Sequence, residues 1–372
     1  MAESSPDIAV IGAGVIGCAV AWELARRGAR VELLDSRDVA LGATQASAGV
    51  LAPYIEGHEK ASLLDLTIRG LALYDEFIDR LRADGHGPAH YYRTGTLETA
   101  ADAGAASVLQ ARARVLASRG VEAEFLDATA VRDAEPHLAA DTAGGLLVRT
   151  HGFVNAPELT FALWQSASAR GVRTRRECRV SRLSSDGPHL RIDTDEGAMT
   201  AAHVVLAAGS WSGQIAAGRG ATVPVRPVRG QLLHLDWPGT PLHRVVWGPS
   251  CYLVPWTDGS LLVGATVEEA GFDERATTTG VHDLLQAACE LVPHGWQAGF
   301  AGVRVGLRPA TADELPIIGR STRLDGLVYA TGHYRNGILL APLTAKLVAD
   351  LVLDGHAGPE LELTSPARFG DC

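Results

Sequence analysis

Three glycines, Gly12, Gly14 and Gly17, lie between a short apolar run and a segment with helical spacing. Gly12 permits a tight turn, Gly14 lets the backbone approach a pyrophosphate, and Gly17 allows a helix to pack closely. The exposed N–H groups and the dipole at the start of that helix attract phosphate groups. The spacing therefore predicts a loop that binds the phosphates of a nucleotide cofactor.

Asp35 follows the next apolar run, residues 30–34, and lies about 20 residues beyond the glycines. A carboxylate at this position accepts hydrogen bonds from a ribose 2′-OH and repels a 2′-phosphate. The pattern therefore predicts NAD or the adenosine half of FAD as the cofactor. A plain loop with three turn glycines is the alternative, and the flanking strand, helix and acid disfavour it.

The elements that position these residues form a βαβ unit, with strands at residues 7–11 and 30–34 and a helix over 15–27 that Gly28 ends. Small residues at 42–50 allow the backbone to approach a flat ring closely. An amphipathic stretch is expected at 62–82, and helices at 101–119, 157–170 and 338–353.

Strands are expected in two groups, one typical of a parallel sheet and one typical of an antiparallel sheet. Strand candidates at 177–183, 203–207 and 326–332 return late in the chain, and the first two suit a parallel sheet completed by distant segments. Residues 91–97 are expected to be a strand that leaves the nucleotide domain. Antiparallel strands are expected at residues 230–235, 250–255 and 260–264.

The composition is that of a globular protein, since 47% of the 372 residues are hydrophobic and 20% are charged. The length predicts two domains or one large composite. A formal net charge of −10 argues against nucleic acid or an anionic membrane as the partner. No disulfide framework or zinc site is readable from the five scattered cysteines, Cys18, Cys178, Cys251, Cys289 and Cys372.

The first residues, MAESSP, are polar, and the apolar run after them is too short for the core of a signal peptide. No stretch reaches the roughly 20 apolar residues that a membrane helix needs. We therefore expect a soluble protein of the cytoplasm.

The chain resembles the D-amino-acid oxidase superfamily of flavoproteins, and within it the glycine oxidase (thiamine-pathway type) and sarcosine oxidase branch. The resemblance spans nearly the whole chain and is much more specific than the glycine motif alone. It rests on Asp35 and on residues 7–17, 44–50, 204–212, 306–309, 315–319 and 332–342.

The resemblance implies an α/β protein with a Rossmann-like, glutathione-reductase-like FAD-binding domain and an α+β substrate domain built on an antiparallel sheet. The FAD-binding domain would comprise residues 1–84, 145–222 and 305–372, and the substrate domain residues 85–144 and 223–304.

The same resemblance implies noncovalent FAD, because the segment in which sarcosine oxidases carry a flavin-linked cysteine reads Val305-Gly306-Leu307-Arg308 here. A helix that begins near Gly337 would direct its positive end at the negative charge of reduced flavin. The implied cofactor residues are Gly12, Gly14, Val15, Ile16, Gly17, Asp35, Ser36, Ala43, Thr44, Ser47, Ala48, Gly49, Val50, Val180, Gly209, Trp211, Gly332, His333, Tyr334, Arg335, Asn336, Gly337, Ile338 and Leu339.

The substrate residues implied by the resemblance are Arg308, which would grip the carboxylate of an amino acid, and Tyr252, which would assist it. A planar guanidinium makes two parallel, charge-assisted hydrogen bonds to a carboxylate and so fixes the α-carbon. A surface ion pair is the alternative for Arg308, and an ordinary core position is the alternative for Tyr252. Arg335 is either a second positive group at the flavin or part of a salt bridge at the lid.

Three positions depart from the glycine oxidase pattern, namely Ala52, Ser250 and Val267, and each bears on the lining of the pocket. An N-substituted glycine or a larger amine therefore competes with glycine as the substrate. The expected reaction is hydride transfer from the α-carbon to flavin N5, hydrolysis of the imine, and reduction of O₂ to H₂O₂. The alternatives are a dehydrogenase that reduces a quinone or carrier protein and a flavin-binding subunit without turnover. A homo-oligomer is left open.

Overall fold

A six-stranded sheet forms the centre of the nucleotide-binding part, in a computed structural model that describes residues 6–56, 61–87, 89–218, 222–256, 258–356 and 358–370. Expectations about residues 1–5 and Cys372 lie outside the described residues. The strand order is β20 (Ile317–Arg320), β21 (Leu327–Thr331), β13 (His203–Leu206), β1 (Ile8–Ile11), β2 (Val31–Leu34) and β9 (Arg173–Arg175). All neighbours are parallel except β20 and β21.

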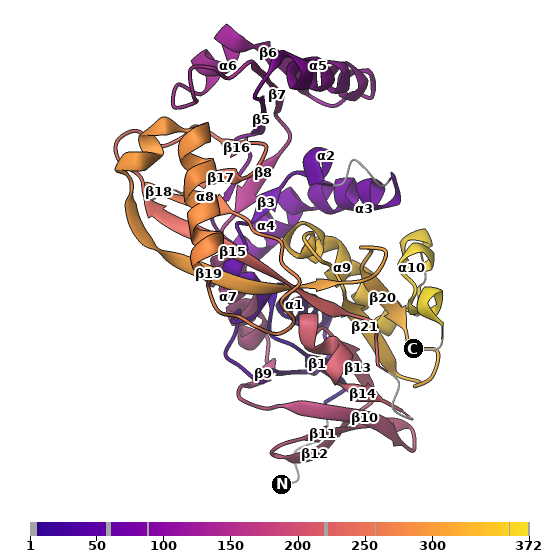
Figure 1. The fold of residues 1–372 in the computed structure, drawn as a ribbon. Helices are drawn as coiled ribbons and strands as arrows, with labels where there is room; N and C mark the ends of the chain where they lie inside the picture. Colours follow the sequence, from indigo (N-terminus) through magenta and orange to yellow (C-terminus); the bar gives the residue numbers. More distant parts are fainter. Residues whose placement is uncertain are drawn as a thin grey trace.

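Both faces of this sheet are covered, which explains why β1 and β2 are buried along their whole length. One face packs against helices α1 (Val15–Arg26), α7 (Ala156–Ala169) and α9 (Gly337–Leu353) (Figure 1). The other face packs against a four-stranded sheet of order β12 (Gly197–Ala201), β11 (His189–Thr194), β10 (Val180–Asp186) and β14 (Ala216–Ala217). This layering is the expected Rossmann-like arrangement.

An eight-stranded sheet forms the second part of the molecule, and it is antiparallel except where β5 meets β16. Helix α8 (Thr278–Leu291) packs on one face of it. Its strand order is β19 (Gly299–Ala310), β15 (Arg226–Asp236), β18 (Ser260–Gly264), β17 (Tyr252–Pro255), β16 (Val245–Trp247), β5 (Thr96–Ala100), β7 (Gly144–Val148) and β6 (Ala123–Asp127).

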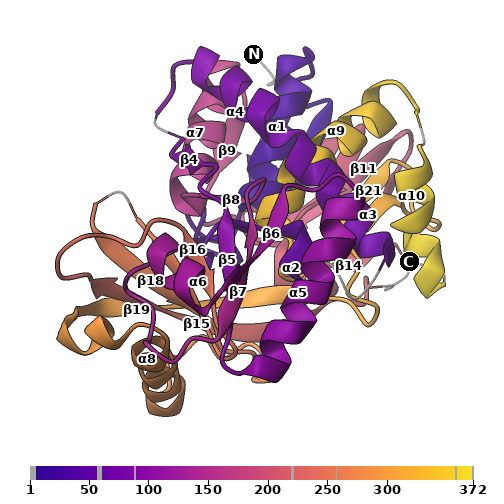
Figure 2. The ribbon, with the colours of Figure 1, turned by 90° about the horizontal axis from the view of Figure 1, so that it is seen from above.

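The two parts face each other across the molecule. Seen from above, α8, β15 and β19 lie on one side, and α1, α7 and α9 lie on the other (Figure 2). The C-terminal half of β19 reaches from the large sheet to the short helices η1 (Ala43–Ala46) and η2 (Gly209–Gln214) of the nucleotide-binding part. This strand therefore connects the two halves of the site described below.

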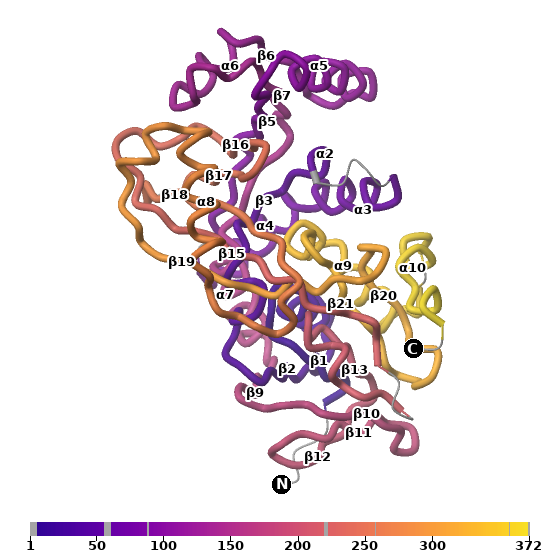
Figure 3. The backbone as a smooth tube through the Cα atoms, in the orientation of Figure 1, coloured from indigo at the N-terminus to yellow at the C-terminus, as the bar shows by residue number. Residues whose placement is uncertain are grey.

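Smaller elements complete the fold. The remaining strands, β3 (Val50–Leu51), β8 (Gly152–Val154) and β4 (Tyr91–Tyr92), form a three-stranded sheet. The chain trace places β10–β12 at one end of the molecule and α5 with α6 at the other (Figure 3). The remaining helices are α2 (Pro53–Glu56), α3 (Ala61–Ala72), α4 (Tyr74–Ala83), α5 (Ala103–Ser118), α6 (Ala128–Ala134), α10 (Pro359–Leu363), η3 (Pro293–Gln297) and η4 (Pro366–Phe369).

Two expectations about single elements were wrong. Residues 91–97 form two strands in different sheets, because the chain turns at Gly95, whose φ is +79°. The amphipathic stretch expected at 62–82 is present and comprises two helices, α3 and α4. Strand β10 pairs antiparallel with β11 and not in the parallel sheet, and its alternating burial fits a sheet with one solvated face.

The division into domains stays a proposal, and two of its boundaries, at 144/145 and 304/305, fall inside β7 and β19 of the eight-stranded sheet. Strand β7 makes its ladder with β5 and β6, so a boundary after Val148 fits the strand pairing better than one at residue 144. Within the part of the chain that the structure describes, no helix combines the length and apolarity needed to cross a bilayer.

Candidate active site

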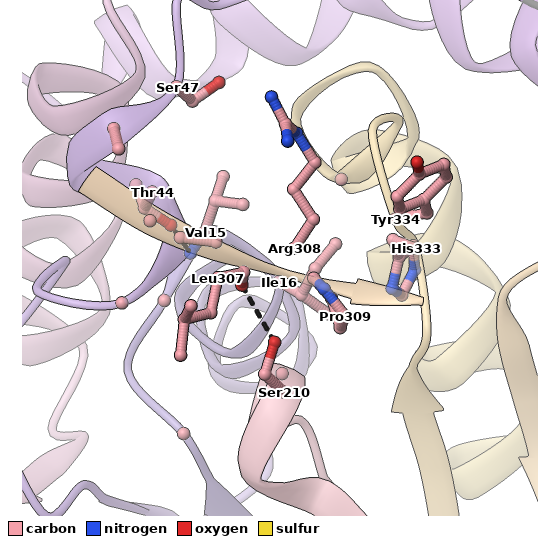
Figure 4. A pocket seen from close by; sticks show the side chains of 18 of the residues that line it. Val15, Ile16, Thr44, Ser47, Ser210, Leu307, Arg308, Pro309, His333 and Tyr334 are labelled. Atoms are coloured by element: carbon pink, nitrogen blue, oxygen red, sulfur yellow. Dashed lines mark hydrogen bonds between the residues drawn. The ribbon is translucent and has the colours of Figure 1, made fainter. Parts of the chain in front are cut away.

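A continuous cavity of about 500 Å³ runs from the glycine turn after β1 to the face of the eight-stranded sheet. Its walls come from both parts of the molecule: η1, η2 and the start of α9 on one side, and β15, β17, β18 and β19 on the other. Figure 4 shows Arg308 of β19 and His333 and Tyr334 before α9 around this space. The cavity thus brings the predicted cofactor and substrate residues into one site.

The glycine turn has the shape that a phosphate site needs. Gly12 has a φ of +109°, and a Cβ there would lie 2.4 Å from the carbonyl oxygen of Ala207. A Cβ on Gly17 would lie 1.7 Å from the carbonyl oxygen of Gly12, so this glycine allows α1 to start against the turn. Around Gly14 the nearest atom to such a Cβ is Thr44 Oγ1 at 3.4 Å, so the backbone there is open to the cavity. The N-terminus of α1 is therefore available to an anion.

Asp35 lies at the end of β2 on the cavity wall. Its Oδ2 accepts a hydrogen bond from the backbone N–H of Ala13 (2.6 Å), and its Oδ1 accepts one from that of Arg37 (2.8 Å). Burial raises the pKa of the Asp35 carboxyl, although both backbone donors oppose that effect. The side chain joins the glycine turn to the end of β2, where the sequence places a ribose.

Most of the predicted cofactor residues line the cavity, and seven of them lie outside its lining. Gly49, for example, has a φ of +71° and packs its Cα against the carbonyl of Val154. The predicted residues outside the lining are Gly17, Ala48, Gly49, Val50, Gly332, Asn336 and Leu339; those in it are Gly12, Gly14, Val15, Ile16, Asp35, Ser36, Ala43, Thr44, Ser47, Val180, Gly209, Trp211, His333, Tyr334, Arg335, Gly337 and Ile338.

Arg308 projects from β19 into the cavity (Figure 4). Its Nη1 donates to the carbonyl oxygens of Thr266 (2.9 Å) and Arg229 (3.3 Å), so one corner of the guanidinium is fixed. Gly230 lies beneath it, and a Cβ there would be 2.4 Å from Nη1. Because Gly230 has no side chain, β15 leaves space for the Arg308 guanidinium at this position.

Tyr252 also lines the cavity, at the start of β17. Its ring lies over Gly264 of the neighbouring strand, where a Cβ would be 2.3 Å from Tyr252 Cζ. The ring of Trp247 lies 4.8 Å from that of Tyr252, measured between centroids. The tyrosine is thus half-buried against the sheet with one side on the cavity.

The loop before α9 closes the site next to β19. The backbone N–H of Tyr334 donates to the carbonyl of Pro309 (2.8 Å), and the Arg335 guanidinium lies 5.2 Å from the Tyr334 ring. His333 is buried and its Nε2 pairs with Thr344 Oγ1 (2.9 Å). Burial lowers the pKa of His333 to about 3, so this imidazole is neutral near pH 7.

Several residues of the site were not predicted from the sequence, namely Arg37, Gly230, Trp247, Gly264 and Thr266. Gly230 and Gly264 carried a readable signal, because an isolated glycine in a strand marks a close approach. Of the three positions that depart from the glycine oxidase pattern, Ser250 and Val267 line the cavity, whereas Ala52 is buried outside the lining.

The residues present fit a bound FAD. The open glycine turn suits a pyrophosphate, and a Cβ on Gly306 would lie 2.8 Å from Ala46 Cβ, so β19 and η1 approach each other only with glycine at this position. Helix α9 starts on the cavity wall without a side-chain cap, which leaves backbone donors at its N-terminus. Among the described residues, no group of three or more His, Cys, Asp or Glu side chains is placed to hold a metal ion.

Comparison with known proteins agrees with this geometry. A family model described as FAD dependent oxidoreductase matches residues 7–351. The bifunctional protein ThiO/ThiG of Synechocystis sp. is 35% identical over 99% of this chain, which spans about half (54%) of that relative. The glycine oxidase of Geobacillus kaustophilus is 35% identical, with 93% of this chain and 92% of the relative covered.

Two solved structures are also similar to this chain. The crystal structure of the Geobacillus kaustophilus glycine oxidase superposes with a TM-score of 0.93 and 34% identity, covering 98% of this chain and 99% of the other. That of iminodiacetate oxidase from Chelativorans sp. BNC1 has a TM-score of 0.88 and 29% identity, covering 96% and 98%.

Proposed function

Because the chain belongs to the family of FAD-dependent oxidoreductases, we propose that it oxidises glycine or an N-substituted glycine and uses O₂ as the electron acceptor. The observation that carries the proposal is the position of Arg308, which is fixed by two carbonyls and projects into the cavity that the glycine turn also lines. A carboxylate bound there would lie in the same cavity as the cofactor. The names of the similar proteins, glycine oxidase and iminodiacetate oxidase, point to the same substrate class.

The chemistry that a bound FAD would supply is acceptance of a hydride from the substrate α-carbon at N5 and reduction of O₂ to H₂O₂. The substrate leaves as an imine, whose hydrolysis gives glyoxylate and ammonia, or an amine for an N-substituted glycine.

The contribution of the protein is mainly orientation. The fork of the Arg308 guanidinium would fix the plane of the substrate carboxylate, and the Tyr252 hydroxyl would donate a further hydrogen bond to it. Asp35 is the only carboxylate among the described residues of the cavity wall, and it lies at the nucleotide end. At the substrate end of the cavity an ammonium group would therefore have no anionic partner. The substrate amine is favoured in its neutral form, and its lone pair assists loss of the hydride.

Positive charge on the cofactor side comes from the N-terminus of α9 and from Arg335, both on the cavity wall. A helix N-terminus stabilises negative charge, and reduced flavin carries such charge near N1. His333 contributes none, because its lowered pKa keeps it neutral.

The substrate is tested with glycine, sarcosine and longer N-alkyl glycines under anaerobic conditions, with flavin bleaching as the readout. We expect the second-order rate constant of flavin reduction to rise along the series, because Ser250 and Val267 reshape the wall and each buried methylene adds about 0.8 kcal/mol. A sharp maximum at glycine would instead assign a plain glycine oxidase, and no bleaching by any amino acid would reject the proposal. Oxygen uptake then distinguishes an oxidase from a dehydrogenase.

The proposed partners are thus a small amino acid and O₂, and the FAD is proposed to be noncovalent. Trichloroacetic acid should release all of the flavin into the supernatant, and flavin that stays in the pellet would show a covalent link. A cytoplasmic location and self-association also stay proposals.

A further inference from the structure

The segment between β18 and α8, residues 265–277, leaves the large sheet and crosses to the nucleotide-binding part; we call it the bridging loop. Ala265 and Val267 at its start line the cavity. Farther along, Phe272 and Glu274 contact residues of the nucleotide-binding part. The loop therefore spans one rim of the site.

The start of the bridging loop is fixed to β15 by a dense set of polar contacts. Glu268 accepts hydrogen bonds from Arg229 Nη2 (2.5 Å), Gln231 Nε2 (2.7 Å) and Thr266 Oγ1 (2.6 Å). The backbones of Arg229 and Glu268 also bond to each other in both directions, at 2.9 and 3.0 Å. The end of the loop is held as well, because Thr277 N donates to Gln231 Oε1 (2.9 Å).

The middle of the bridging loop is held by a different kind of contact. Arg37 makes a two-pronged ion pair with Glu274, in which Nη1 donates to Oε1 (3.0 Å) and Nη2 to Oε2 (2.7 Å). The same guanidinium lies 4.3 Å above the ring of Trp211, and the Phe272 ring lies 5.9 Å from that ring. Two side chains from the loop thus meet two from the nucleotide-binding part.

These contacts lie at the cofactor end of the cavity. Arg37 and Trp211 both line it, and the backbone N–H of Arg37 bonds to Asp35, the predicted ribose ligand. Trp211 follows Gly209 in η2, which also lines the cavity. A cofactor in this cavity would therefore lie beneath the side chains that the bridging loop touches.

We propose that Arg37, Trp211, Phe272 and Glu274 form a clasp that retains the cofactor, so that FAD leaves the protein only after the middle of the bridging loop separates from η2 and from Arg37. The Arg37 and Glu274 side chains are 33% and 29% exposed, which leaves the ion pair open to screening by salt. The proposal rests on the FAD site of the proposed function and does not depend on which amine is oxidised. Glu274 and Phe272 act through Arg37 and Trp211 and are positioning residues.

The test is the rate at which the holoenzyme releases FAD on dilution, followed by the rise in flavin fluorescence. Glu274→Gln and Phe272→Ala should each speed release by about two- to fivefold, the range expected for a partly exposed pair. High salt should accelerate release from the parent protein and have less effect on Glu274→Gln. Phe272→Leu, which keeps an apolar contact, should lie between the parent and Phe272→Ala.

Glu269→Gln is the matched control, because Glu269 belongs to the same loop but pairs with Arg226 and lies outside the cavity wall. This variant should release FAD and oxidise substrate as the parent does. If Glu274→Gln and Phe272→Ala release FAD no faster than Glu269→Gln, the clasp does not exist. If release coincides with loss of far-UV circular dichroism, unfolding and not opening of the loop sets the rate, which also overturns the proposal.

The outcomes separate this proposal from the proposed function. A protein that binds FAD but oxidises no amino acid would reject the function and still report on the clasp through fluorescence. A protein that binds no FAD at all would reject both.

Discussion

The Arg308 guanidinium can lie over the neighbouring strand β15 because that strand has a glycine, Gly230, directly beneath it. Arg308 is opposite Val228 in the β15–β19 ladder, and the guanidinium extends over Gly230. The carbonyls of Thr266 and Arg229 hold one edge of it. A fixed fork of this kind differs from a mobile surface arginine in that it sets the direction of its remaining donors.

Replacement of Arg308 should therefore damage both substrate binding and orientation. Arg308→Lys keeps the charge but loses the fork, and we expect kcat/KM for amino acids to fall about tenfold to hundredfold, which corresponds to one charge-assisted hydrogen bond of roughly 1.5–3 kcal/mol. Arg308→Ala should cost more. Steady-state oxidation measured against an amine without a carboxylate gives the control, since that amine should be much less affected. Parent-like oxidation of amino acids by both variants would move the carboxylate site to Arg335.

Gly264 provides a second test at the residue scale. A Cβ there would lie 2.3 Å from Tyr252 Cζ, so Gly264→Ala must displace the tyrosine ring from the cavity wall. We expect kcat/KM to fall by roughly tenfold to hundredfold, because a shift of about 1 Å at a reacting centre has effects of that size. FAD content should stay at the parent level. If the effect runs through Tyr252, adding Gly264→Ala to Tyr252→Ala should cause little further loss; a full additional loss would exclude that route.

The βαβ unit is the element in which sequence and structure agree most closely. Strand β1, helix α1 and strand β2 fall within a residue or two of the expected bounds, and Asp35 reaches back to the glycine turn through Ala13. This agreement has a physical basis, because local steric constraints require each glycine of the turn, and these constraints can be inferred from the sequence.

Asp35 should therefore strengthen FAD binding in two ways, through a hydrogen bond to the ribose and through the two backbone N–H groups that it holds in place. We expect Asp35→Ala to weaken FAD binding by about 1.5–3 kcal/mol for the lost ribose contact, with a further loss from the two backbone donors left without their acceptor. Asp35→Asn keeps an acceptor oxygen and should weaken it less. Titration of the FAD-free protein with FAD, followed by flavin fluorescence, measures both. Equal affinity in all three proteins would remove Asp35 from the site.

Other elements could not be placed from the sequence because their identity depends on partners far along the chain. The run at 177–183 does not reveal its partner strand, and β10 pairs with β11 and has one solvated face. Likewise, Gly230 and Gly264 acquire their roles only from the register of β15, β17, β18 and β19, which brings them beneath Arg308 and Tyr252. The glycine turn and Asp35 were predicted from local pattern, whereas Arg308 and Tyr252 came from the resemblance to a family.

At the scale of the whole molecule, two histidines are buried in separate regions and kept neutral. Burial lowers the pKa of both His333, before α9, and His151, beside β5, to about 3. Each has a hydrogen-bond partner, Thr344 for His333 and Thr96 for His151. Both histidines therefore link the fold to pH, because the unfolded chain would expose them with an ordinary pKa near 6.5.

The sign of this linkage follows from where the extra proton binds. Between about pH 3 and pH 6.5 the unfolded chain holds a proton on each histidine that the folded protein does not, so acid favours unfolding. Stability from this source is complete above pH 6.5 and is lost as the pH falls, by on the order of 1.4 kcal/mol per pH unit for each histidine.

His333→Gln isolates one of the two contributions, because the amide keeps a partner for Thr344 and does not titrate. Between pH 7 and pH 5 the parent should lose about 2 kcal/mol more of its unfolding free energy than the variant does, which is the linkage expected for one histidine over that interval. Urea unfolding at both pH values measures the difference. If the curves of the parent and His333→Gln run parallel, His333 takes up its proton equally in the folded and unfolded states, and the neutral imidazole at the cofactor cavity is refuted.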